Sequence, residues 1–146
     1  MDYRHGPDRR RGAYGVTAPW IKLGDAAGVA AHGDYLTGRV PDAAGAAIPV
    51  VVQNFQGALK AFRNVCSHRY ALIHDRPCGR GLLRCPYHGW VYDAAGVPIG
   101  IPFDDSDFHL DAEARRRLAL APVGLAVASG QVWVNADAAA IFTEPA

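Results

Sequence analysis

Hydrophobic residues fall in short runs along the chain, separated by residues that favour turns. The apolar or alternating runs are 34–40, 48–53, 58–64, 82–85, 90–93, 120–128 and 131–135. Runs of this length, bounded by Gly, Pro, Asp and Asn, predict short strands at the spacing of an all-β sandwich or barrel. Two turns are the clearest, Gln56-Gly57 and Ser129-Gly130, because each places a glycine that can take a positive φ between two apolar runs.

The ends of the chain and one internal segment depart from this pattern. Residues 110–118 (LDAEARRRL) contain good helix formers, with Asp111 as the expected N-cap and three arginines near the C-terminal end, where the helix dipole favours positive charge. Residues 1–19 have no apolar period and are expected to form a leader that is extended or partly disordered. The predicted domain spans residues 20–136, and residues 137–146 are expected to form a C-terminal tail.

Composition limits the classes of function. The chain has 146 residues, 50% of them hydrophobic, which fits one globular domain. Fifteen Lys and Arg against 14 Asp and Glu give a net charge of +1, so charge does not indicate nucleic acid or a membrane as a partner. No apolar stretch approaches the roughly 20 residues of a spanning helix, and the N-terminus has no apolar signal region. We therefore expect a cytoplasmic protein.

The candidate chemistry lies in the centre of the chain, where two Cys-His pairs occur. Cys66-Ser67-His68 is followed after sixteen residues by Cys85-Pro86-Tyr87-His88. Each pair comes after a predicted strand, so the two loop tips can converge on one inorganic centre. Thiolates suit ferric iron and bridging sulfide, and two imidazoles on the second iron raise the potential above that of an all-cysteine cluster. This pattern favours a 2Fe-2S cluster with Cys66 and Cys85 on one iron and His68 and His88 on the other.

These residues have two other interpretations. A zinc-binding structural module is possible in principle with two Cys and two His, but zinc modules usually pair Cys with Cys and His with His at short spacings. A disulfide between Cys66 and Cys85 leaves both histidines unexplained. It also leaves Cys78, the third cysteine, unpaired, and we expect Cys78 to be a free thiol in a loop.

The residues around both pairs indicate a family. The segment Asn64-Val65-Cys66-Ser67-His68-Arg69, the segment Cys85-Pro86-Tyr87-His88-Gly89-Trp90-Val91-Tyr92-Asp93, and then Gly96 and Pro98, closely resemble the N-terminal Rieske domain of ring-hydroxylating (Rieske non-haem iron) oxygenase large subunits. The resemblance implies a Rieske fold of small antiparallel sheets, with a two-loop cluster-binding subdomain. It also implies that Arg69, Tyr87 and Trp90 surround the cluster or form a docking surface.

The second segment also separates branches of the family. High-potential Rieske proteins carry an extra cysteine in each loop and a serine after the second His-Gly, whereas this chain has Tyr87 and Trp90 at the corresponding places of the second loop. Fewer hydrogen bonds to sulfur stabilise the reduced state less. The sequence therefore predicts a potential near roughly −150 mV, the low end of the Rieske range.

Several residues depart from the family pattern or lie outside it. Many relatives have Gly where this chain has Tyr70, so we expect the loop after His68 to turn differently or the Tyr70 ring to shield the cluster. The remaining histidines are expected to be surface residues and not ligands. They are His5, His32, His74 and His109.

The resemblance implies a role in oxygenation that needs a second protein part. An oxygenase requires a mononuclear iron held by two histidines and a carboxylate, and these residues of the family would lie beyond residue 146. We therefore expect no catalytic residues in this chain and interpret it as the domain through which single electrons enter an aromatic-ring-hydroxylating or related Rieske oxygenase. A stand-alone Rieske ferredoxin is the alternative, and the substrate and the choice between mono- and dioxygenation stay open.

The resemblance also implies the partners. The electron donor would be a ferredoxin or flavin reductase, and the acceptor would be the mononuclear iron oxygenase domain or subunit. Family members form trimers, so the resemblance makes a homotrimer possible. In these trimers one subunit's cluster faces a neighbour's iron across an acidic bridge, and this bridge belongs to the catalytic domain. Whether this chain forms a trimer by itself therefore stays open.

Overall fold

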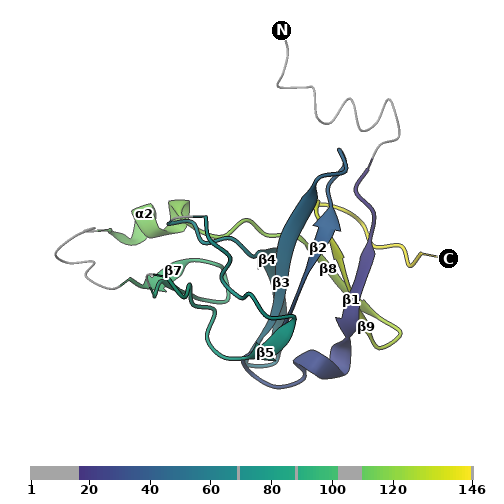
Figure 1. The fold of residues 1–146 in the computed structure, drawn as a ribbon, viewed down its shortest axis with the longest axis horizontal. Coiled ribbons are helices and arrows are strands. Elements are labelled where there is room, and N and C mark those ends of the chain that lie inside the picture. Colours follow the sequence, from purple (N-terminus) through teal and green to yellow (C-terminus); the bar gives the residue numbers. More distant parts are fainter. Residues whose placement is uncertain (1–16, 69, 88, 102–109, 146) are drawn as a thin grey trace, which may run out of the picture.

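The computed structural model describes residues 17–68, 70–87, 89–101 and 110–145, and the strands of this part form three small antiparallel sheets (Figure 1). The strand orders are β1-β9-β8, β4-β3-β2-β5 and β6-β7. In chain order the elements are β1 (Ile21–Asp25), the 3-10 helix η2 (Ala26–Val29), β2 (Asp34–Pro41), β3 (Ala47–Phe55), β4 (Ala58–Arg63), β5 (Cys78–Arg80), β6 (Val91–Tyr92), β7 (Pro98–Gly100), α2 (Ala112–Arg117), β8 (Gly124–Ala128) and β9 (Gln131–Asn135). The predicted all-β class is confirmed.

The four-stranded sheet separates two hydrophobic clusters. Its strand β3 contains Val50, Val51 and Val52, all with no exposed surface. Because successive side chains of a strand point to opposite faces, Val50 and Val52 pack in the cluster shared with β1 and β9, and Val51 packs in the cluster on the other face. This second cluster also contains Cys66 and Cys85, so the sheet is the base on which both loops rest.

Local signals in the sequence predicted the turns and the helix correctly. Gln56 and Gly57 have φ values of 55° and 97°, and Ser129 and Gly130 have values of 54° and 71°, as tight hairpins require. Asp111 is the N-cap of α2, and its side chain accepts a hydrogen bond from the Ala114 N–H at 2.8 Å. Among the described residues, no helix has both the length and the apolar character needed to cross a membrane.

Three strands were not predicted, and one predicted strand is absent. β1, β5 and β7 form although their sequences carry no clear alternation. Residues 82–85 make only an isolated bridge, between Arg84 and Val91.

The C-terminal segment, expected to be a tail, contacts the domain through Ile141 and Phe142. The Trp20 Nε1–H donates to the Ile141 carbonyl at 3.0 Å, and the Phe142 ring meets the Trp20 ring edge-on at 5.0 Å between centroids. At the other end, residues 1–16 of the expected leader lie outside the described part.

Candidate metal centre

The loop that contains the first Cys-His pair is closed by backbone hydrogen bonds. The Cys66 N–H donates to the Ala71 carbonyl at 2.7 Å, and the Tyr70 N–H donates to the Cys66 carbonyl at 2.6 Å. A bridge between Val65 and Leu72 joins the two ends of the loop. The cysteine is thus held at the base of a tight turn, with the following residues at its tip.

The loop that contains the second pair has the same hydrogen bonds at the same spacing. The Cys85 N–H donates to the Trp90 carbonyl at 2.8 Å, and the Gly89 N–H donates to the Cys85 carbonyl at 2.9 Å. The bridge between Arg84 and Val91 closes this loop. Two loops of the same backbone design therefore present one cysteine each.

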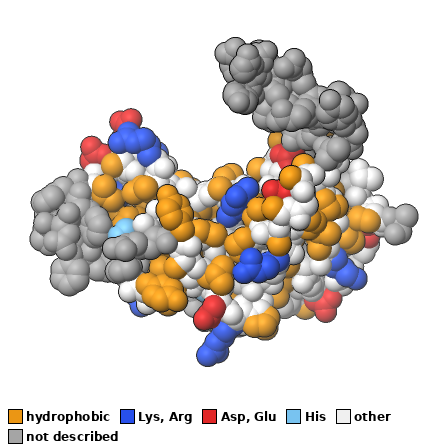
Figure 2. Space-filling model, turned by 45° about the horizontal axis from the view of Figure 1, so that its top comes forward, with side chains coloured by type: hydrophobic (Ala, Val, Ile, Leu, Met, Phe, Trp, Pro, Cys, Tyr) orange, Lys and Arg blue, Asp and Glu red, His pale blue; other side chains and the backbone are white. Residues whose placement is uncertain are grey.

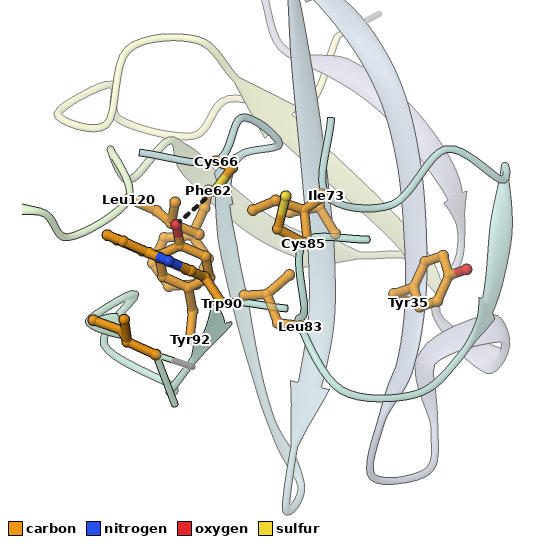
Figure 3. Packing of buried hydrophobic residues seen from close by; sticks show 11 residues of the cluster. Tyr35, Phe62, Cys66, Ile73, Leu83, Cys85, Trp90, Tyr92 and Leu120 are labelled. Atoms are coloured by element: carbon orange, nitrogen blue, oxygen red, sulfur yellow. Dashed lines mark hydrogen bonds between the residues drawn. The ribbon is translucent and has the colours of Figure 1, made fainter. Parts of the chain in front are cut away.

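Both cysteine side chains are fully buried and belong to one hydrophobic cluster (Figure 3). The cluster surrounds them with Ile73, Leu83 and Tyr92, among others. Apolar surroundings and hydrogen bonds to sulfur are the means by which proteins hold an iron-sulfur cluster and adjust its potential. The two thiols therefore fit the iron that the sequence assigns to them.

Among the described residues, two groups lie within hydrogen-bonding distance of the Cys66 sulfur. The His68 N–H points to Sγ at 3.4 Å. The Tyr92 hydroxyl lies 3.1 Å from Sγ, as the dashed line in Figure 3 marks. The Tyr92 oxygen is also 3.1 Å from the Ser67 N–H, which donates to it, and 3.0 Å from the Ser67 hydroxyl. A thiolate can only accept hydrogen bonds, so with a metal bound the Tyr92 O–H donates to sulfur.

Tyr92 stays protonated and can serve as this donor. Burial raises the pKa of its hydroxyl, and the hydrogen bond with Cys66 raises this pKa further. Tyr92 belongs to the family-like segment Cys85-Pro86-Tyr87-His88-Gly89-Trp90-Val91-Tyr92-Asp93, but no role was predicted for it. Its contact with the Cys66 sulfur is seen only in the structure.

His68, the predicted ligand of the first loop, packs against the second loop. Its imidazole ring lies parallel to the Trp90 indole, with 4.6 Å between ring centroids and 2° between planes. Trp90 is 2% exposed, which does not fit a docking surface. Tyr87, in contrast, is 71% exposed, as a docking residue must be. Arg69 and His88 lie outside the described residues.

Of the four predicted ligands, the described residues include Cys66, His68 and Cys85. Within this part of the chain, no three His, Cys, Asp or Glu side chains gather closely enough to hold a single metal ion. The predicted 2Fe-2S core spreads its ligands over two irons, two on each, so it does not require three of them around one ion.

Tyr70 does not change the turn of its loop. It adopts a φ of 59°, close to the 74° of Gly89 at the equivalent position of the second loop. Its side chain is 79% exposed. The first loop thus turns as the second loop of this chain does, and the Tyr70 ring is largely in solvent.

His74 is not a surface residue, contrary to the expectation from the sequence. Its Nε2 lies 2.9 Å from Gln53 Oε1, and its ring stacks on the Tyr35 ring at 3.6 Å between centroids. Burial lowers the pKa of His74 to about 4, and the nearby Asp75 carboxylate opposes this change. The imidazole is therefore neutral at physiological pH, and it lies half-buried between Gln53 and Tyr35.

Asn64 connects the region of His74 to the first loop. Its side-chain oxygen accepts from the N–H groups of Ile73 and His74 at 3.2 and 3.0 Å, and its Nδ2 donates to the His74 carbonyl at 2.7 Å. Asn64 is two residues before Cys66 and is 2% exposed. These bonds fix the start of the loop to the chain that leaves it.

Cys78, the third cysteine, is an exposed free thiol as expected, but it lies in strand β5 and not in a loop.

A hollow of about 580 Å³ opens beside Tyr92. Its lining includes Phe55, Leu82 and Ile99, and the last two are 58% and 57% exposed. Exposed apolar residues around a hollow are common where proteins contact partners. On the face drawn in Figure 2, basic and acidic side chains are interspersed with hydrophobic ones.

Comparison with known families identifies the class of this domain. The model of the Rieske [2Fe-2S] domain family matches residues 19–121, well over half of the chain. The chain belongs to the Rieske [2Fe-2S] domain family, whose cofactor is the Rieske-type 2Fe-2S cluster. This assignment agrees with the three small sheets, the short helix and the paired loops described above.

The relatives of the chain are oxygenase subunits. It is 33% identical over 118 residues to the oxygenase subunit of glycine betaine monooxygenase from Chromohalobacter salexigens, an alignment that covers 80% of this chain and 24% of the relative. It is 33% identical over 90 residues to the alpha subunit of chlorobenzene dioxygenase from a Cupriavidus species, covering 61% and 19% respectively. The chain therefore spans about a quarter or less of these relatives.

Solved structures show the same fold. Naphthalene 1,2-dioxygenase with bound indole superposes with a TM-score of 0.71 at 26% identity, over 86% of this chain and 28% of that one. The quaternary ammonium Rieske monooxygenase CntA also gives 0.71, at 23% identity over 92% of this chain and 36% of that one. The chain thus corresponds to the Rieske domain of such oxygenase subunits.

Proposed function

We propose that this domain transfers single electrons through a 2Fe-2S cluster held by Cys66 and Cys85 on one iron and by His68 and His88 on the other. The observation that carries the proposal is the pair of equivalent loops, which place both cysteines in one buried cluster with His68 close by. The 2Fe-2S cluster supplies reversible one-electron chemistry when it is bound.

The residues of the chain have separate tasks in this function. The buried thiolates anchor the inner iron, and the apolar cluster around them keeps water away. Tyr92 and the His68 N–H donate hydrogen bonds to the Cys66 sulfur. Such bonds stabilise the negative charge that reduction adds and so raise the potential.

We further propose that electrons pass from a ferredoxin or flavin reductase through this domain to a mononuclear iron oxygenase domain or subunit, in a cytoplasmic system. The relatives support this role, because each is an oxygenase subunit several times longer than this chain. The exposed Tyr87 and the hollow rimmed by Leu82 and Ile99 are surfaces that such partners could contact. Aromatic ring hydroxylation and a homotrimeric assembly stay part of the proposal.

Electron paramagnetic resonance of the dithionite-reduced protein tests the ligand set. Mixed nitrogen and sulfur ligation gives a lower average g value than an all-thiolate cluster, and nitrogen couplings from two imidazoles should be resolved. His68→Cys and His88→Cys variants should keep a cluster but lower its potential. A colourless protein with stoichiometric zinc, or a His88→Cys variant with an unchanged potential, would contradict the proposal.

The role in an oxygenase has a separate test. The coding region next to this one should specify the two histidines and the carboxylate of a mononuclear iron site, and the protein carrying them should oxidise the reduced domain. A domain that exchanges electrons with a reductase but has no such acceptor would be a stand-alone ferredoxin.

A further inference from the structure

Trp90 is held rigidly at the boundary between the two loops. Its carbonyl accepts the Cys85 N–H at 2.8 Å, which fixes its backbone in the second loop. Its indole is buried in the same hydrophobic cluster as Phe62, Tyr92 and Leu120 (Figure 3). An aromatic ring held at both backbone and side chain cannot easily rotate, so it presents a fixed plane to its neighbours.

The His68 imidazole lies against this plane. The rings are parallel within 2°, with centroids 4.6 Å apart. On its other side, the backbone of His68 is fixed by the hydrogen bond from its N–H to the Cys66 sulfur at 3.4 Å. The stack on Trp90 and this backbone bond therefore both hold His68, one from each loop.

We propose that Trp90 is a positioning residue that fixes the plane of the His68 ligand and lowers the midpoint potential of the cluster. The proposal rests on the function proposed above, because it requires His68 to bind iron. Trp90 does not bind the metal in this proposal and acts only through the imidazole.

Two physical effects give the direction of the change. The face of an indole is electron-rich and favours an electron-poor ring in contact with it. Reduction adds negative charge to the cluster and its ligands, so the stack favours the oxidised state. The buried indole also excludes water from one face of the imidazole, and water would otherwise stabilise the more highly charged reduced state. Both effects lower the potential.

The test compares the loaded full-length chain with four variants. Trp90→Leu and Trp90→Met remove the aromatic face, and Trp90→Phe keeps a smaller one. Trp133→Leu is the control for losing an indole elsewhere in the domain, because Trp133 is partly buried in β9, away from the four-stranded sheet that supports the loops. Redox titration at one pH gives the midpoint potential, and pulsed electron paramagnetic resonance of the reduced state gives the couplings of the ligand nitrogens.

We expect the Leu and Met variants to shift the potential upward, by up to about tenfold in the electron-transfer equilibrium constant, which is 59 mV for one electron. One of the two nitrogen couplings should change with it. The midpoint potential of Trp90→Phe should lie between those of the Leu and Met variants and that of the wild-type protein. Trp133→Leu should leave the potential and the nitrogen couplings unchanged. A purely structural role would lower cluster content or melting temperature without moving the potential.

Unchanged potentials and couplings in the Leu and Met variants would overturn the proposal. If neither variant takes up a cluster, Trp90→Phe decides, because its smaller ring covers less of the imidazole: an upward shift supports the proposal and no shift overturns it. A wild-type protein without nitrogen couplings would instead contradict the proposed ligand set. The two failures are therefore distinguishable.

Discussion

Tyr70 and Gly89 occupy equivalent positions in the two loops, and both have a left-handed backbone. Each donates its N–H to the carbonyl of the cysteine four residues earlier, and the φ values are 59° and 74°. Glycine adopts this conformation freely, whereas a residue with a side chain pays roughly 1 kcal/mol. Because the Tyr70 ring is 79% exposed, burial does not offset this cost. The first loop is therefore strained where the second is relaxed.

This strain predicts an unusual order of stability among variants. Tyr70→Ala keeps the strain and Tyr70→Gly removes it, so the Gly variant should be more stable than the Ala variant by about 0.5 to 1 kcal/mol. Urea unfolding of both variants measures the difference. At Ala95, an exposed residue outside the left-handed region, replacement by Gly should lower the unfolding free energy, as is usual. A Tyr70→Gly variant less stable than Tyr70→Ala would show that the strain is absent.

The hydrogen bond from Tyr92 to Cys66 predicts a change in potential. A hydrogen bond of this kind contributes about 1 kcal/mol, so its loss in Tyr92→Phe should lower the midpoint potential by roughly 40 mV, on a scale of 59 mV per tenfold for one electron. Redox titration of the loaded protein measures this shift. Tyr35→Phe removes a hydroxyl from another buried tyrosine, and its potential should equal that of the wild type. Equal shifts in both variants would mean that the hydroxyl near sulfur has no specific effect.

The elements predicted correctly from the sequence are those encoded by neighbouring residues. The turns at Gln56-Gly57 and Ser129-Gly130 and the cap at Asp111 depend on a few adjacent residues, and each forms as predicted. The cysteine-histidine segments identified the family for the same reason, since their spacing lies within single loops. Local backbone preferences and ligand spacing are enough to identify such features.

The features that were missed depend on contacts between distant parts of the chain. β1 exists because Ile21 pairs with Val134, more than one hundred residues away, and β5 exists because Cys78 pairs with Leu36. The contact of Tyr92 with Cys66 likewise requires the second loop to pack on the first. The sequence pattern of each segment alone contains no sign of its partner, so these features became visible only in the folded chain.

Asn64 should be needed to retain the cluster. Asn64→Ala leaves the N–H groups of Ile73 and His74 and the His74 carbonyl without their partner. Losing these buried hydrogen bonds should lower the unfolding free energy by about 2 to 4 kcal/mol. Because the loop with Cys66 starts two residues later, chelator-induced loss of visible absorbance should also become faster.

Asn54→Ala provides the matched control for this prediction. Asn54 is also buried, donates to the Val29 carbonyl at 2.8 Å and accepts from the Gly57 N–H at 2.7 Å, at the β3–β4 turn away from both loops. The Asn54→Ala variant should have a lower unfolding free energy but should not lose the 2Fe-2S cluster faster than the wild type. If both variants lose the cluster at the same rate, then Asn64 acts only on global stability.

His74 predicts a specific dependence of stability on pH. Burial lowers its pKa from 6.5 to about 4 in the folded state. Below pH 6.5 the unfolded chain therefore binds a proton that the folded chain does not bind until the pH approaches 4, so stability must fall as the pH decreases across this window. Between pH 7 and pH 5 the contribution should be roughly 1 to 2 kcal/mol, near the lower value because the ring is partly exposed and solvent screens it. His74→Phe keeps an aromatic ring against Tyr35 but cannot titrate, so the difference in unfolding free energy between wild type and variant should shrink as the pH falls. A difference that stays constant from pH 7 to pH 5 would show that His74 is protonated equally in both states.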